Sequence, residues 1–383
     1  MITVSSAFDA GAIEVVSISP EPALEAGGPA ARLRLKLPTD NASDFRQWFY
    51  FRLQGARGVR CAMHVTNCAQ SAYPEGWPEY RAVASTDRQH WFRVPTRFEH
   101  GVLIIDWTPP TDDVYLAYFE PYSSERHLDL LARVAGSERA RVTRLGASVD
   151  GRDIDLVTVG EPAPHKKRVW VIARQHPGET MAEWFIEGLL ERVLGACAVA
   201  AAVLEKAVLY IVPNMNPDGS ARGNLRTNAA GVNLNREWLH PTLDKSPEVF
   251  LVRAKMHEVG VDFFLDVHGD ESLPYVFIDG SHMLPGRSAA NIEREARFIK
   301  AVSAACPDFQ TEHGYAFDRF SEELLTLASK YVGHTFNCLS VTLEMPFKDN
   351  ANQPDAQHGW SGARSRTMGA QMLAAIAADL GVT

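Results

Sequence analysis

A histidine and a glutamate three residues apart, His176 and Glu179, are the residues of this chain best suited to bind a metal ion. They lie in Arg174-Gln-His-Pro-Gly-Glu-Thr180, where an apolar stretch ends and a helical pattern begins. Imidazole and carboxylate groups both ligate zinc, and a catalytic zinc site needs three protein ligands and an open position for water. Pro177 disfavours helical backbone at His176 and suits the first position of a helix. We therefore predict His176 just before a helix and Glu179 in its first turn, where both reach one ion.

A third ligand follows further along the chain. His268 comes directly after the apolar residues 261–267 and can complete a His/Glu/His set. Asp266 could orient a neighbouring imidazole from outside that set, or serve as a buried polar partner within the sheet. Each residue taken alone also has a purely local interpretation, because a strand-end histidine can bond to backbone and Glu179 can interact with a helix dipole.

Acid–base and anion-binding residues accompany the predicted ligands. Glu344 can act as a general base, because a carboxylate near a partly desolvated metal site can accept a proton from water and pass it to a leaving amine. The loop 222–238 contains three arginines, whose planar guanidinium groups bind carboxylates and stabilise oxyanions. The alternatives are a solvated Glu344, which shares a strand face with Ser340 and Thr342, and a solvated loop.

Alternating strands and helices from Ser124 onward predict an α/β domain with a mostly parallel central sheet. The predicted strands are residues 168–174, 207–213, 261–267 and 339–345, and the predicted helices are 124–134, 181–193 and 367–380. Ser124 is a possible N-cap, and the Ala-rich run 195–204 is interpreted as a helix end and connection. Ligands of such sheets bind beyond the carboxyl ends of the strands. His176, the segment 214–219, His268 and Glu344 lie at four of these ends.

The residues before this region predict a separate β domain. Alternating polar and apolar residues mark strands at 32–37, 47–53, 59–65 and 101–107, separated by turn-forming residues. We predict a small antiparallel β-sandwich over residues 1–123 and the α/β domain over 124–383.

Composition narrows the class of protein. The 383 residues are 46% hydrophobic and 22% charged, which is typical of a globular protein, and the length suggests two domains. A net charge of −9 favours neither nucleic acid nor an anionic membrane as a partner. The five scattered cysteines indicate no disulfide framework, and the first residues lack the pattern of a signal peptide, so we expect a cytoplasmic protein. No pattern predicts an oligomeric state.

Together these motifs resemble the zinc carboxypeptidase family, and within it the cytosolic carboxypeptidase branch. The resemblance covers residues from Ser124 to the C-terminus. The N-terminal part, with Gln47-Trp-Phe-Tyr-Phe-Arg52, is similar to the β-sandwich domain that precedes the catalytic domain in that branch. The motifs, in the family's order, are His176-Pro-Gly-Glu179, Asn216-Pro-Asp-Gly219, Gly231-Val-Asn-Leu-Asn-Arg-Glu-Trp238, Leu265-Asp-Val-His268 and Thr342-Leu-Glu-Met345.

The resemblance implies a carboxypeptidase-like fold, with helices on both faces of the sheet, and a role for each motif residue. His176, Glu179 and His268 would bind one Zn²⁺ ion. Arg226 would polarise the scissile carbonyl and stabilise the oxyanion, and Glu344 would be the general base and then the acid. The substrate, a peptide or protein C-terminus, would be held at its carboxylate by Asn235 and Arg236.

The family's mobile tyrosine has no clear equivalent. Secreted members carry it some twenty residues before the catalytic glutamate, where this chain has Glu322, and the nearest preceding tyrosine is Tyr331. Lys330 is a candidate for the specificity pocket, where a cation would favour acidic C-terminal residues, as in the cytosolic branch. Its alternative is a solvated surface lysine.

The leading hypothesis is therefore a zinc carboxypeptidase, and the finer hypothesis is that it removes C-terminal glutamate. A second hypothesis keeps fold and metal but makes the enzyme a deacylase of N-acyl amino acids or an amidase of cell-wall peptides. A third is a non-enzymatic peptide-binding module that uses the β-sandwich.

Overall fold

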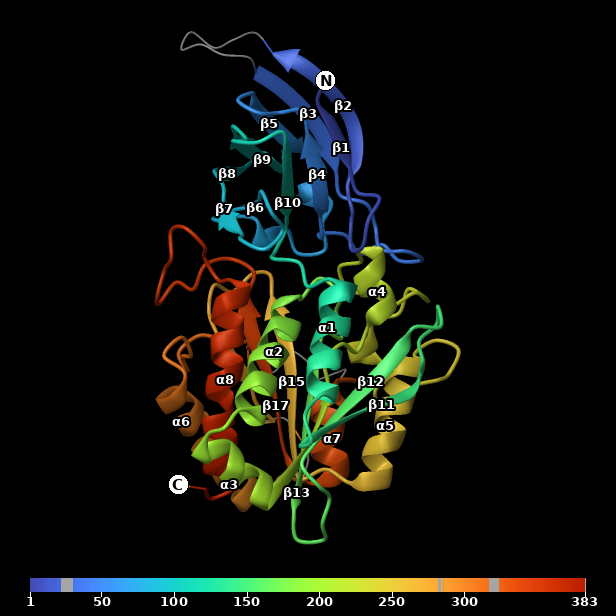
Figure 1. The fold of residues 1–383 in the computed structure, drawn as a ribbon, viewed down its shortest axis with the longest axis vertical. Helices are drawn as coiled ribbons and strands as arrows, with labels where there is room; N and C mark the ends of the chain where they lie inside the picture. The colour runs from blue at the N-terminus through green and yellow to red at the C-terminus, as the bar shows by residue number, and fades with distance from the viewer. Residues whose placement is uncertain (22–29, 282–283, 285, 317–323, 383) are drawn as a thin grey trace.

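The computed structural model describes all residues except 22–29, 282–283, 285, 317–323 and 383, and it contains two domains (Figure 1). The N-terminal domain packs two five-stranded sheets. One has the order β1 (Thr3–Ser5), β4 (Tyr50–Gln54), β10 (Asp113–Ala117), β6 (Val83–Ser85) and β7 (Phe92–Arg93). The other has the order β2 (Glu14–Glu21), β3 (Ala30–Lys36), β5 (Arg60–Val65), β9 (Val102–Trp107) and β8 (Thr96–Glu99).

The predicted all-β domain is confirmed, but it is not wholly antiparallel, because β3 and β5 pair in parallel. Along β3, buried and exposed side chains alternate, so one face of its sheet lies in the core. Short 3-10 helices, η1 (Cys68–Gln70) and η2 (Pro74–Gly76), follow β5.

The second domain contains a seven-stranded mixed sheet. Its order is β11 (Ala140–Ala147), β12 (Asp153–Val159), β14 (Ala207–Val212), β13 (Lys167–Ala173), β15 (Phe263–Asp270), β17 (Leu339–Pro346) and β16 (Phe277–Asp279). The four strands predicted from the sequence form its parallel centre. The sheet is mixed because β11, β12 and β16, which the sequence analysis did not identify, pair antiparallel at its edges.

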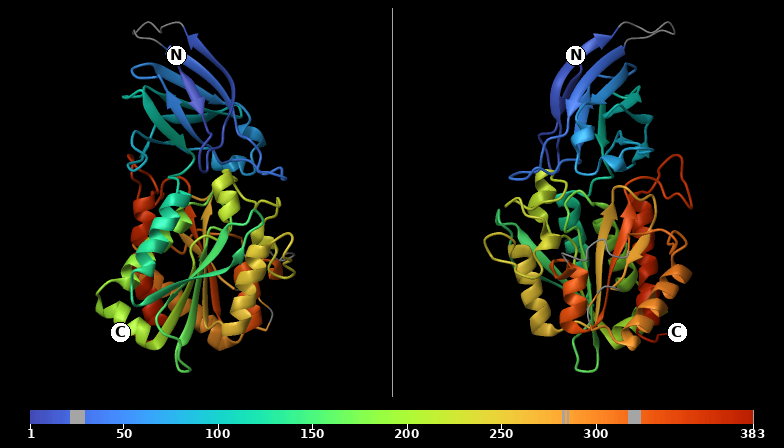
Figure 2. Two further views of the ribbon diagram at one scale, coloured as in Figure 1. Left: turned by 45° about the vertical axis from the view of Figure 1, so that its right-hand side comes forward. Right: turned by 180° about the vertical axis from the view of Figure 1, so that it is seen from behind.

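Helices cover both faces of this sheet (Figures 1 and 2). Alternate residues of β13 enter two separate hydrophobic clusters: Val169 and Val171 pack with the helices of one face, and Trp170 and Ile172 with those of the other. The first face carries α1 (Ser124–Ala135), α2 (Met181–Leu194), α3 (Ala198–Lys206), α6 (Ala289–Ala305) and α8 (Gly362–Asp379), and the second carries α5 (Pro247–Val259) and α7 (Ala328–Phe336). Shorter helices are α4 (Pro217–Arg222), η3 (Leu234–Arg236) and η4 (Leu324–Thr326).

Two local predictions were wrong. The N-cap of α1 is Ser123, whose hydroxyl accepts a hydrogen bond from the Arg126 amide, whereas Ser124 bonds to Asp9. The Ala-rich run 195–204, predicted as a helix end and connection, contains the start of a separate helix, α3, because alanine has the highest helix propensity.

The N-terminal domain sits over the carboxyl ends of the parallel strands, beside α4, which follows β14 (Figures 1 and 2). Arg93 is buried in the interface, where its guanidinium donates to the carbonyls of Phe347 and Trp360. The ring of Tyr118 stacks on that of Phe347 at 4.6 Å. Because Phe347 directly follows β17, these contacts place the N-terminal domain at the same edge of the sheet as the predicted site.

The sequence predicted no disulfide framework and did not favour a membrane as a partner. All five cysteines lie in the described part of the chain and are free thiols. Within the residues that the structure describes, none of the helices has the length and apolar character needed to cross a membrane.

Candidate metal centre

The turn between β13 and α2 positions the first two predicted ligands. The Glu179 amide donates to the His176 carbonyl, and Gly178 donates to the Leu225 carbonyl, which closes the turn against the arginine-containing loop. A Cβ on Gly178 would lie 3.0 Å from that carbonyl oxygen, so glycine permits the close approach. The helix begins only at Met181, so Glu179 precedes it and is not in its first turn as predicted.

Arg174 stabilises this turn through the hydrogen bonds of its side chain. It has a left-handed backbone conformation with φ of 59°, which is uncommon for a residue with a side chain. Its guanidinium donates to the Pro177 carbonyl at 3.0 Å and to Glu183 at 2.6 Å, and all three residues are buried. The charge-assisted contacts hold the Pro-Gly turn and therefore the side chains on either side of it.

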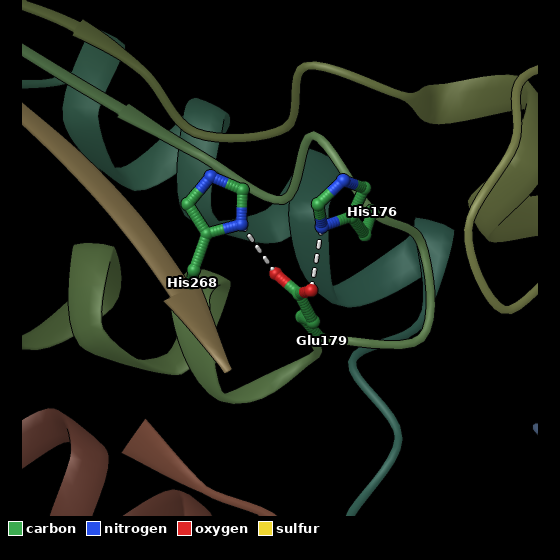
Figure 3. A group of neighbouring side chains, drawn as sticks. All are labelled: His176, Glu179 and His268. Atoms are coloured by element: carbon green, nitrogen blue, oxygen red, sulfur yellow. Dashed lines mark hydrogen bonds and ion pairs between the residues drawn. The ribbon is translucent and has the colours of Figure 1, made fainter. Parts of the chain in front are cut away.

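The structure brings His176, Glu179 and His268 together (Figure 3). Their candidate ligand atoms lie within 4.8 Å of one another, and all three side chains are buried. The Nδ1 atoms of His176 and His268 lie 2.6 and 2.7 Å from the two carboxylate oxygens of Glu179. Two imidazoles and one carboxylate converging on one point are the ligand set of a catalytic zinc site.

The outward nitrogens of both imidazoles also have partners suited to metal ligation. The Nε2 atom of His268 lies 2.9 Å from Asp266, and that of His176 lies 3.0 Å from the side-chain oxygen of Asn233. Such contacts fix the ring orientation of a metal-bound histidine, and a carboxylate partner raises its basicity. Asp266 thus occupies the supporting position considered from the sequence.

Charge in the cavity also fits a divalent cation. Burial, together with the nearby charge of Arg226, lowers the pKa of His176 to about 3, so its imidazole is neutral, as metal binding requires. Burial also lowers the pKa of His268, but the carboxylates of Asp266 and Glu179 outweigh it and raise that pKa well above the usual value, so metal binding there would release a proton.

Burial raises the pKa of Glu344 and Glu271 well above the ordinary value, with repulsion from Glu179 adding to both shifts. A divalent cation among these carboxylates would relieve that repulsion. The residues present therefore fit zinc.

Glu344 lies beside the ligand set because of strand register. In the parallel pairing of β15 with β17, its Cα atom is the partner of the His268 Cα atom. The side chain is buried and lines the cavity, so the predicted solvated alternative does not apply. Within the described part of the chain its Oε2 atom has no hydrogen-bond partner, which leaves one oxygen available to a substrate or water.

The predicted substrate-binding residues line the same cavity of about 170 Å³: Arg226, Asn235 and Arg236, together with the metal set and Glu344. The amide oxygen of Asn235 accepts a hydrogen bond from the Ala328 backbone at 2.8 Å, and the Arg236 guanidinium donates to the Asn235 carbonyl at 2.7 Å. Arginine and asparagine donors next to a metal set can bind a carboxylate while an adjacent carbonyl faces the metal.

Lys330 does not occupy the predicted position. Its side chain is buried outside the cavity wall, where the ammonium pairs with Asp279 at 2.8 Å and also contacts the Gly280 carbonyl. The wall itself carries Asp279, Ser329 and Thr342. Lys330 therefore neither lines the pocket as predicted nor is solvated as in the alternative, and Asp279 on the wall balances its charge.

The candidates for a mobile tyrosine also differ from expectation. Tyr331 lies against α5, where its hydroxyl is 3.0 Å from Nε2 of His257, and it does not line the cavity. Glu322 lies outside the described residues. Tyr315 lines the cavity instead, with its hydroxyl 2.7 Å from Asp270.

Several residues that line the cavity were not predicted from the sequence, for different reasons. Asp270 and Glu271 follow His268 at the same strand end, so the rule that found the histidine could have found them. Tyr315 lies in a stretch without a periodic pattern, and Tyr73 comes from the other domain. No local sequence signal could have identified either tyrosine.

A larger cavity, of about 630 Å³, lies elsewhere, over the edge strand β11 and its neighbour β12. It is lined by residues such as Arg141, Leu156 and Tyr210 and reaches Lys166, which lies just before β13. It is thus at the opposite end of the sheet from the metal set. Because functional groups converge at the carboxyl ends, we assign the chemistry to the smaller cavity.

Comparison with known proteins agrees with this geometry. Residues 126–358 match the family described as zinc carboxypeptidase, and residues 4–119 match the cytosolic carboxypeptidase N-terminal domain. This chain belongs to the zinc carboxypeptidase family. The predicted family and fold class are therefore confirmed, and the protein is a metallocarboxypeptidase.

Solved structures of other family members are similar over the whole chain. A metallo-carboxypeptidase from Burkholderia cenocepacia is 53% identical with a TM-score of 0.95, covering 100% of this chain and 99% of that one. A metallo-carboxypeptidase from Pseudomonas aeruginosa, solved in complex with (2-guanidinoethylmercapto)succinic acid, is 45% identical with a TM-score of 0.91, covering 99% of both. Mouse cytosolic carboxypeptidase 6 is 27% identical over 69% of this chain and 53% of its own length.

Replacement of a ligand tests the metal centre. We expect His268→Ala to purify with little zinc, and to lose more metal affinity than the roughly 10–100-fold cost of removing an outer partner. Elemental analysis after dialysis against zinc measures this. His257→Ala is the matched control, because that histidine is exposed on α5 and should leave zinc content unchanged. Equal zinc in both variants would contradict the assignment.

Proposed function

We propose that this metallocarboxypeptidase is zinc-dependent and hydrolyses the C-terminal peptide bond of peptides or proteins. The main support is the convergence of three elements in one buried cavity: a His/Glu/His set, a carboxylate one strand away, and arginine and asparagine donors. We further propose that it acts in the cytoplasm and binds neither nucleic acid nor membrane.

The chain's own residues supply most of the chemistry. Asn235 and Arg236 would bind the terminal carboxylate and thereby place the last peptide bond beside the metal set. Arg226 would stabilise the negative charge that develops on the carbonyl oxygen. Zinc held by the three ligands would supply the Lewis acidity that activates water.

Glu344 would transfer the proton. It lies beside His268 with one oxygen unpartnered among the described residues, and can accept a proton from the attacking water. It would then donate that proton to the amine of the departing residue. Its burial raises its pKa, which makes the protonated form easier to reach during the cycle.

Replacement of Glu344 tests proton transfer independently of metal binding. We expect Glu344→Gln to retain zinc while kcat falls on the order of 10²–10⁴-fold, the usual contribution of a general base. Chelation should abolish the wild-type activity, and added zinc should restore it. A wild type that is active and insensitive to chelators would refute zinc dependence.

Recognition of the free carboxylate distinguishes an exopeptidase from an endopeptidase. We expect Arg236→Ala to raise KM on the order of 10–100-fold, the worth of a hydrogen bond to a charged group, with a smaller effect on kcat. Peptides with an amidated C-terminus should be poor substrates of the wild type. Unchanged kinetics in the variant would show that Arg236 does not bind the carboxylate.

The glutamate preference stays a prediction, now supported only by the resemblance to the cytosolic branch. The paired charges of Asp279 and Lys330 balance, so the cavity wall there favours neither an acidic nor a basic terminal residue. The compound bound to the Pseudomonas enzyme contains a guanidinium group, which makes a basic terminal residue the second candidate. Peptides that differ only in the last residue would decide between glutamate, arginine and neutral residues.

The Asp279–Lys330 pair provides a sharper comparison. Glutamate and glutamine side chains have nearly the same shape. The kcat/KM for a peptide ending in glutamate, divided by that for a peptide ending in glutamine, therefore reports the effect of charge. We expect Asp279→Asn to raise this ratio about 10-fold, because the Lys330 charge is then uncompensated. An unchanged ratio would show that the pair does not contact the terminal side chain.

A deacylase or amidase is the alternative on the same fold. It would use the same metal set and would bind the carboxylate of a small N-acyl amino acid at Arg236. Cleavage of acyl-amino acids by a protein inert toward peptides would support it.

A further inference from the structure

The Arg226 loop is bound directly by the N-terminal domain. Asp40, in the connection between β3 and β4, is buried with 4% of its surface exposed. One of its carboxylate oxygens accepts the Leu225 amide at 2.6 Å. The other accepts the amides of Arg226 at 2.8 Å and Thr227 at 2.9 Å, and the Thr227 hydroxyl at 3.0 Å. One side chain therefore satisfies three successive backbone donors around the arginine.

The arginine side chain rests on the same domain. Its guanidinium carbon lies 5.7 Å from the ring centre of Phe45 and 5.4 Å from that of Tyr73. Such cation–π contacts are worth more when the partners are removed from water, and all three of these side chains are partly buried. Asp40 also donates its own amide to the Phe45 carbonyl at 2.7 Å, so the loop that binds the arginine backbone also positions one of the rings.

Neighbouring contacts keep the two loops in register. Asn41 exchanges hydrogen bonds with Asn224 and donates to the Ala229 carbonyl at 2.6 Å. A Cβ on Gly231 would lie 2.3 Å from the Ala42 carbonyl oxygen, so the two backbones approach as closely as glycine allows. The arginine loop thus has little freedom to move independently of the N-terminal domain.

We propose that Asp40 is a positioning residue of the catalytic site, through which the N-terminal domain holds Arg226 in place for oxyanion stabilisation. The proposal rests on the carboxypeptidase function proposed above. It gives the N-terminal domain a part in catalysis, since a buried carboxylate from that domain organises the loop that carries the arginine. A misplacement of about 1 Å at such a group can cost up to about 100-fold in rate.

Asp40→Asn tests this with little change in shape. The amide keeps one oxygen acceptor but replaces the other with a donor that faces backbone amides. We expect kcat on a peptide substrate to fall about 10–100-fold with KM changed much less, and zinc content to be unchanged. Asp44→Asn is the matched control, because Asp44 is exposed in the same loop and should keep wild-type kinetics.

Coupling to Arg226 separates positioning from simple support of the fold. If Asp40 acts through the arginine, Asp40→Asn combined with Arg226→Ala should be no slower than Arg226→Ala alone. Full kcat in Asp40→Asn, or an effect that multiplies with that of Arg226→Ala, would overturn the proposal. An inactive wild type would instead refute the proposed function.

A milder variant covers the case in which Asp40→Asn does not fold, as judged by thermal unfolding. Thr227→Val removes one of the four donors to the carboxylate and preserves side-chain shape. We expect the fall in kcat of Thr227→Val to be smaller than that of Asp40→Asn, and KM should change little. A folded Thr227→Val with wild-type kcat, where Asp40→Asn does not fold, would also overturn the proposal.

Discussion

The parallel pairing of β13, β15 and β17 is the constraint on which the site depends. In this register His268 and Glu344 are direct partners on adjacent strands, and Ala173 pairs with Val267 just before the two strands reach the metal set. A slip of one residue would turn either side chain to the opposite face of the sheet. Because alternate residues of these strands fill two different hydrophobic clusters, such a slip would also exchange the side chains that pack in each cluster and disrupt both.

Charge is the second determinant of the site. Among the described residues, five carboxylates and two arginines line the cavity, and burial shifts the pKa of Glu344 and Glu271 upward. A buried cluster of this kind is unfavourable unless a cation balances it. The same arrangement serves function, because a carboxylate that is easily protonated beside a metal set is suited to proton transfer.

The N-terminal domain contributes residues to the site of the second domain. It contributes Tyr73 to the cavity wall and, through Asp40, the hydrogen bonds that order the loop of Arg226. The interface is therefore more than a connection between independently working units. Its buried ion–backbone contacts, such as those of Arg93, would cost several kcal/mol if left unpaired, which favours a fixed arrangement of the domains.

The sequence by itself determined the residue types, the four central strands and the convergence of His176, Glu179, His268 and Glu344 at one edge of the sheet. It could do so because carboxyl ends of parallel strands meet, whatever the details of packing. Resemblance to a family added the roles of Arg226, Asn235 and Arg236. Only the tertiary structure decided that Asp279 pairs with Lys330 and that Tyr73 and Asp40 reach the site from the other domain. These contacts join residues far apart in the chain, and their distances depend on side-chain packing and domain docking, which no local pattern encodes.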